Sequence, residues 1–195
     1  MSQSTPRTAP VGFFSIFAAA AIGLAACGPH ERELRVQPAP PAESFILSDA
    51  DAASIMSTAN NAEIQEGQLA LQKSRNDAVR QFAQRMVSDH SSMNQQLAEH
   101  MRRHNGMAGA NPLTDQLVAN GRTTMQNLQQ LDGLQFDRAY IQNQVAMHQW
   151  LLNTIDNALI PGVHDDRLEK ELRVARDVIA EHLQQARQIH SSLGR

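Results

Sequence analysis

In four long stretches of the sequence, apolar residues recur at alternating steps of four and three. We call each such row of positions a seam, and ionisable residues occupy one or two positions of each seam. Steps of four and three keep side chains on one face of an α-helix, so the pattern predicts helices that pack together along that face. The alternation of apolar and polar residues that is typical of strands is absent. Aromatic residues, which favour strands, make up only 4% of the chain. The expected fold class is therefore all-α.

Capping and helix-breaking residues divide this region into five helices. Ser48, Asn111 and either Asp165 or Asp166 are favourable residues before a first helical turn, and Pro161-Gly162 is a typical stop. The expected helices cover residues 48–73, 77–104, 112–131, 134–159 and about 166–193. The third helix is short and lies between two long pairs. This order predicts a ferritin-like four-helix bundle over 48–193, with a short crossover helix, about 112–131, between the second and third bundle helices.

The interruptions of the seams are the candidate site. His90, His148 and His182 each stand at a seam position of a different long helix, and Glu63 and Glu66 interrupt the seam of the first helix. Burying one ionisable side chain without a partner costs several kcal/mol, of order 2–7 for a polar group, so isolated interruptions are disfavoured. We therefore expect these side chains to meet in the core.

Two explanations of such a cluster remain open. One is a single divalent metal ion (Zn, Fe, Mn or Cu) bound by His90, His148 and Glu63, with His182 or Glu66 completing or supporting the shell. The other is a metal-free hydrogen-bonded cluster that fixes the register of the helices. A di-iron centre is not expected, because the Glu-x-x-His pairs and four carboxylates of such bundles are missing.

The level of each residue along its helix tests whether the cluster can form. At 1.5 Å per residue, Glu63 and His90 lie within ~3 Å of the same level when counted from the turn between their helices. If the fourth helix ends near residue 159, His148 and His182 differ in level by ~9 Å. Helical geometry thus favours Glu63, His90 and His148 as ligands over His182.

We interpret the first 27 residues as an export signal. Residues 11–24 contain no charge and are too short for a membrane span, which needs ~20 apolar residues. The following Leu24-Ala25-Ala26-Cys27-Gly28 resembles the lipobox of bacterial lipoproteins. That resemblance implies cleavage before Cys27, a lipid on its sulfur, and a location at the outer membrane facing the periplasm. The alternative is an ordinary signal peptide with an incidental cysteine.

Residues 28–47, which include four prolines, are expected to form a tether.

The charge and the cysteine content exclude several classes of function. The formal net charge is −3, whereas nucleic-acid binding calls for a basic surface. Cys27 is the sole cysteine, so neither a disulfide nor a thiolate metal site is expected in the bundle. No catalytic motif is recognisable, and an enzyme is not expected. The two hypotheses are thus a metal-binding envelope protein and a non-enzymatic structural or interaction protein.

Four segments resemble, in the right order, the bacterial family described as domain of unknown function 4142. They are residues 60–70 (NNAEIQEGQLA), 82–90 (FAQRMVSDH), 136–148 (FDRAY followed by VAMH) and 181–183 (EHL). The resemblance implies a ferritin-like helical fold and an outer-membrane or periplasmic location, without an assigned activity. The positions typical of the family fall on Glu63, Asp89, His90, Asp137, Tyr140, His148 and His182.

Overall fold

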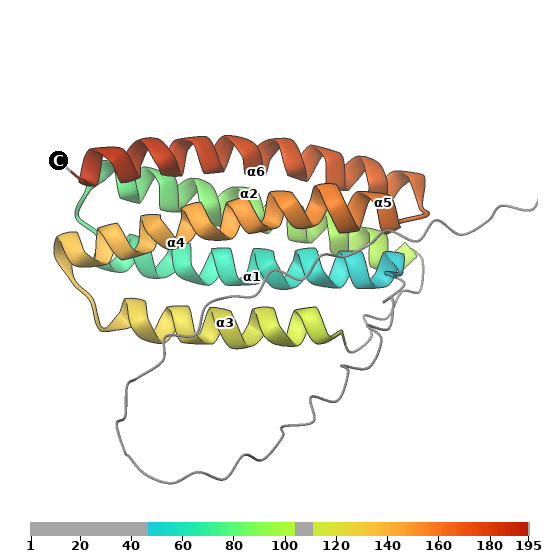
Figure 1. Ribbon diagram of the computed structural model, residues 1–195, viewed down its shortest axis with the longest axis horizontal. Coiled ribbons are helices and arrows are strands. Elements are labelled where there is room, and N and C mark those ends of the chain that lie inside the picture. The colour runs from blue at the N-terminus through green and yellow to red at the C-terminus, as the bar shows by residue number, and fades with distance from the viewer. Residues whose placement is uncertain (1–46, 104–110, 195) are drawn as a thin grey trace, which may run out of the picture. The chain divides into compact units, whose positions relative to one another are not determined.

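The computed structural model describes residues 47–103 and 111–194, and every regular element in these ranges is helical (Figure 1). The predicted signal peptide, the lipid on Cys27 and the tether up to residue 46 lie outside the described residues. Within the described ranges, no helix is both long and apolar enough to cross a membrane.

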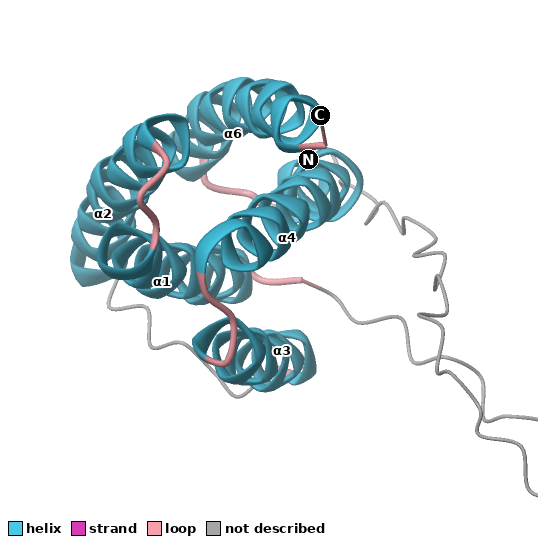
Figure 2. Ribbon diagram, turned by 90° about the vertical axis from the view of Figure 1, so that its left-hand side faces the viewer, coloured by secondary structure: helices cyan, strands magenta, loops and turns pink. Residues whose placement is uncertain are grey.

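Four long helices form the bundle, and a fifth packs against its outside (Figures 1 and 2). The bundle helices pair as α1 with α2 and α4 with α6, and α3 packs on α1 and α4. This arrangement confirms the predicted four-helix bundle with a crossover helix. The bounds are α1 Asp49–Lys73, α2 Asp77–Arg103, α3 Pro112–Gln129, α4 Gly133–Thr154, η1 Ile155–Leu159, α5 Ile160–Gly162 and α6 Asp166–Leu193.

Local hydrogen bonds explain where the helices begin. The hydroxyl of Ser48 accepts from the backbone N–H of Asp51, and the carboxylate of Asp51 accepts from the backbone N–H of Ser48, which completes a capping box. Asn111 caps α3 ahead of Pro112. Asp165, one of two predicted caps, accepts from the first backbone N–H groups of α6. Side chains readable in the sequence therefore set the positions of these helices.

The end of the fourth helix differs from the prediction. It was expected to stop near residue 159, but the helical path continues through a π-helical turn, η1, and through Pro161 to Gly162. The backbone N–H of Ile160 donates to the carbonyl of Ile155, five residues back, instead of four. We attribute the continuation to this shift, because Pro161 has no N–H to donate and its ring would clash within a regular turn. The backbone N–H of Val163 then donates to the carbonyl of Leu159 at 3.1 Å.

Two apolar clusters fill the bundle. One includes Ile55, Leu159 and Leu168, and the other includes Phe82 and Phe136. Neither cluster contains the buried ionisable residues of the seams, which are Glu63, Glu66, His90, His148 and His182. The apolar packing on both sides holds these polar side chains away from water.

The contact between α1 and α2 is very close near the polar side chains. A Cβ atom on Gly67 would lie 3.1 Å from the carbonyl oxygen of Ala83 and 3.0 Å from Cγ2 of Val87. Glycine is thus the residue that lets these two backbones approach, one position after the buried Glu66. The close packing leaves little room for solvent on this side of the core.

Candidate metal centre

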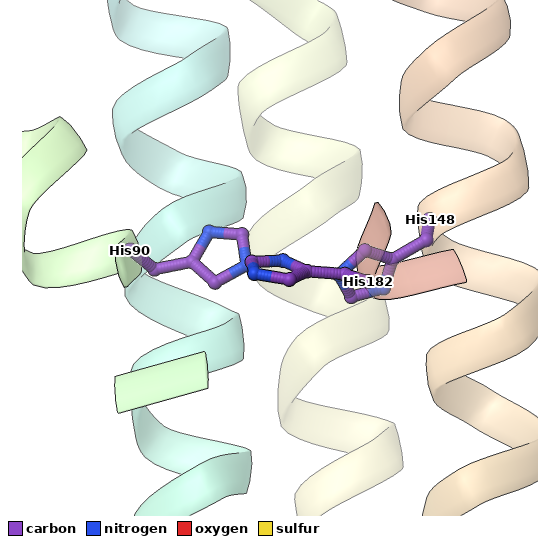
Figure 3. Close-up of side chains that lie close together, drawn as sticks. All are labelled: His90, His148 and His182. Carbon is purple, nitrogen blue, oxygen red and sulfur yellow. The ribbon is translucent and has the colours of Figure 1, made fainter. Parts of the chain in front are cut away.

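Three histidine rings converge in the core from three different helices (Figure 3). His90 comes from α2, His148 from α4 and His182 from α6, and all three are 0% exposed. Their ring centroids are 5.7 Å apart for His90 and His148, and 5.4 Å for each of the other two pairs. One ligand atom of each ring lies within 4.8 Å of the others. The histidines that interrupt three separate seams therefore meet.

The hydrogen bond of His90 determines which of its nitrogens carries the proton. Its Nδ1 lies 2.9 Å from Oδ1 of Asn60. The side-chain nitrogen of Asn60 donates to Oδ1 of Asn94 at 3.0 Å, so the oxygen of Asn60 is the atom that faces the ring. An amide oxygen only accepts, and Nδ1 of His90 must therefore be the donor. Nε2 of His90 is left with a free lone pair and no hydrogen-bond partner.

The other two rings follow the same logic. Nδ1 of His148 donates to the backbone carbonyl of Gln144 at 2.8 Å, and Nε2 of His182 donates to Oδ2 of Asp89 at 2.9 Å. Nε2 of His148 and Nδ1 of His182 have no hydrogen-bond partner. Each ring thus has one N–H held by an oxygen and one buried, unprotonated nitrogen. Metal-binding histidines have this arrangement, because the second hydrogen bond fixes both the tautomer and the ring orientation.

Burial keeps the three rings neutral, which is the form that can bind a cation. Desolvation lowers the pKa of His90 well below its usual value, and the charges of the other two histidines add to the effect. Desolvation also lowers the pKa of His148 to about 3. The pKa of His182 is lowered by burial, although Asp89 opposes that shift. No proton therefore occupies the free nitrogens at neutral pH.

Glu63 lies beside this group but does not belong to it. Its Oε1 is 3.9 Å from Nδ1 of His148, the nitrogen that already donates to the carbonyl of Gln144. Both carboxylate oxygens of Glu63 are buried without a hydrogen-bond partner. Desolvation, followed by the charge of Glu66, raises the pKa of Glu63 well above its usual value.

Glu66 takes part in a different contact. Its Oε2 accepts from Nδ2 of Asn143 at 2.7 Å and from Nε2 of Gln144 at 3.0 Å. Desolvation raises the pKa of Glu66 to about 7, although both hydrogen bonds favour the ionised form. Among the described residues, neither glutamate joins the group of three nitrogens. The two glutamates are thus neighbours of the candidate centre.

The expectation that His182 lies about 9 Å off the level of His148 is wrong. It assumed that the fourth helix ends near residue 159, whereas the helical path reaches Gly162. Counted from Gly162 and from Asp166, the start of α6, the two histidines differ by about two residues, or ~3 Å. The three extra residues therefore bring His182 level with His148.

The spacing of residues in the sequence does not reveal which side chains orient the three rings. Asn60 and Asp89 stand in the family-like segments, but nothing in the pattern shows that they accept hydrogen bonds from histidines on other elements. For His148 a signal was present, because Gln144 stands one helical turn earlier and places its carbonyl within reach of the ring. The pairings of Asn60 and Asp89 depend on the packing of α2 against α1 and α6, which spacing alone does not give.

Comparisons with known proteins agree with this architecture. The crystal structure of a DUF305 protein from Streptomyces coelicolor superposes with a TM-score of 0.66 over 75% of this chain and 93% of that chain, at 13% sequence identity. At this identity the likeness shows a common helical fold and nothing more. No curated protein matches the sequence at a significant level. The model of the family described as Domain of unknown function (DUF4142) matches residues 34–189, and the chain therefore belongs to this family.

Proposed function

We propose that this protein binds one divalent transition-metal ion through Nε2 of His90, Nε2 of His148 and Nδ1 of His182. The observation that supports the proposal is the group of three buried imidazole nitrogens that have no hydrogen-bond partner. A buried acceptor without a partner costs about 1–3 kcal/mol. A single cation among the rings would satisfy all three, and their second nitrogens are already held in place for it.

The donor atoms narrow the choice of metal. Imidazole suits Zn, Cu, Fe and Ni, whereas carboxylate, carbonyl and water suit Mg, Ca and Mn. With no carboxylate oxygen among the three donors, we favour Zn, Cu or Fe over Mn. Glu63 and Glu66 are buried and their pKa values are raised, and a doubly charged ion bound nearby would favour their ionised form, which compensates its charge. Such compensation matters because an unpaired charge in a dry core is very costly.

The burial of the rings favours metal handling or electron exchange over catalysis on a substrate. All three histidines are 0% exposed, so a substrate would not reach the ion without a rearrangement of the helices. The metal-free alternative, in which the cluster only fixes helix register, would need hydrogen-bond donors for the three nitrogens. The described residues offer none to these atoms.

Elemental analysis of protein purified without an affinity tag tests the proposal. We expect close to one metal ion per chain in the wild type and a loss of most of it in His90→Ala. His190→Ala is the matched control, because His190 is an exposed histidine on α6 and its removal should leave the metal content unchanged. A metal-free wild type that also fails to bind added Zn, Cu, Fe or Mn would refute the proposed function.

We further propose that the mature chain is anchored at the cell envelope by a lipid on Cys27. The support is the lipobox-like segment that follows an uncharged stretch of signal-peptide length. Several acyl chains bind firmly, since each buried methylene contributes about 0.8 kcal/mol. Cys27→Ser should move the protein from the membrane fraction to the soluble fraction, while Ser44→Ala should not. An intact-mass measurement that shows wild-type protein with an unmodified Cys27 would exclude the anchor.

A further inference from the structure

The three residues that accept a hydrogen bond from the histidine rings differ in their exposure to water. The ring of His90 is backed by Asn60, and the ring of His148 is backed by the carbonyl of Gln144; both of these residues are 0% exposed. The ring of His182 is backed by Asp89, whose side chain is 31% exposed. Of these three partners, only Asp89 presents a carboxylate that is partly exposed to solvent and also in contact with a histidine of the core.

Asp89 connects the surface to the core through a single oxygen atom. Its Oδ2 accepts from Nε2 of His182 at 2.9 Å and from Nε of Arg85 at 3.2 Å. Arg85 is held in turn by Oε2 of Glu181 at 2.6 Å and by Oε1 of Gln185 at 3.3 Å. The guanidinium therefore links Asp89 on α2 to Glu181 and Gln185 on α6.

The charges of this group suit a cation. Two carboxylates, Asp89 and Glu181, share one guanidinium, so the group carries a formal charge of −1. A second polar path reaches the surface from His90 through Asn60, Asn94 and the exposed Asn61. That path consists of neutral amides, which attract a divalent ion far less strongly than a carboxylate does.

We propose that Asp89 is the port through which the metal ion enters and leaves the three-histidine core. The inference rests on the proposed function, because it assumes that the core binds an ion. The arriving cation displaces Arg85 from the carboxylate of Asp89. Outward rotation of the His182 ring then lets the ion pass to the free nitrogens behind it. Arg85 holds the port closed between such events.

The rates of metal uptake and release test this role. Trp150 is the single tryptophan and lies two residues after His148 on α4, so bound Cu²⁺ should quench its fluorescence. In stopped-flow mixing, Asp89→Asn keeps an oxygen that can accept from His182 but removes the charge. We expect uptake and release of Cu²⁺ both to slow about tenfold, because the carboxylate stabilises the ion during passage in either direction, so that the Kd changes little.

Two further variants separate a port from other roles. Glu181→Gln removes the other carboxylate that pairs with Arg85, one that does not accept the hydrogen bond of the His182 ring, and it should change uptake less than about twofold. Arg85→Ala frees Asp89 and should speed uptake about threefold or more. The proposal would be overturned if Asp89→Asn left the rates of Cu²⁺ uptake and release unchanged. It would also be overturned if the variant only released Cu²⁺ faster, with a correspondingly weaker Kd. Failure of the proposed function would look different, because the wild type itself would then show no saturable quenching.

Discussion

Metal-free protein supplied with its ion at about a thousand times the Kd should gain about 4 kcal/mol in its free energy of unfolding. For a domain of this size each kcal/mol shifts the Tm by about 2–4 °C, so the midpoint should rise by about 8–16 °C. The reason is linkage: the three nitrogens are brought together only in the folded bundle, and the unfolded chain cannot hold the ion in the same way.

His148→Ala should abolish this gain. The variant removes one of the three converging nitrogens and leaves His90 and His182, which are too few to fix an ion in a dry core. Thermal unfolding followed by circular dichroism, with and without the metal, measures the effect. His164→Ala, at an exposed histidine outside the cluster, should behave like the wild type. A wild type whose Tm is the same with and without Zn, Cu and Fe would contradict the expected stabilisation.

Replacing the polar cluster by apolar side chains should make the metal-free protein more stable, by about 1–4 kcal/mol. The proposed variant combines His90→Leu, His148→Leu, His182→Leu and Glu63→Met. It removes three unpartnered ring nitrogens and two unpartnered carboxylate oxygens from the core. It also gives up two hydrogen bonds worth about 0.5–1.5 kcal/mol each and the bond to the carboxylate of Asp89, worth about 1.5–3 kcal/mol. The loss of His90 further leaves Oδ1 of the buried Asn60 without a donor, at a cost of about 1–3 kcal/mol. The removed desolvation costs outweigh these losses.

Urea unfolding in the presence of a chelator measures this difference, with both proteins free of metal. Glu63→Gln alone is the matched control: it keeps a polar group at the same buried position, so it should capture little of the gain. A fourfold variant that is less stable than the metal-free wild type would count for the other hypothesis, in which the cluster is a stabilising hydrogen-bond network. The expected result would instead mean that the bundle retains the histidines for binding, at a cost in stability.

The positions of the helices could be predicted from the sequence because capping and periodicity depend on residues that are close along the chain. Ser48, Asn111 and Asp165 cap the helices they were expected to begin, since each capping bond joins residues only two or three positions apart. The seam positions of His90 and His148 also followed from spacing, because an α-helix keeps a fixed rotation per residue. The end of the fourth helix was missed, since whether Pro161 stops a helix depends on a rearrangement of hydrogen bonds that the sequence does not display.

By itself, the sequence determined the fold class, the order of the helices and the ionisable residues that face the core. Each of these follows from the periodicity of one helix or from neighbours along the chain. The tertiary structure decided which of these residues form the candidate centre. It placed His182 with His90 and His148, left Glu63 beside them, and gave each ring its own hydrogen-bond partner. These choices depend on the relative level and rotation of packed helices, and a shift of a few residues, ~1.5 Å each, is enough to change which side chains meet.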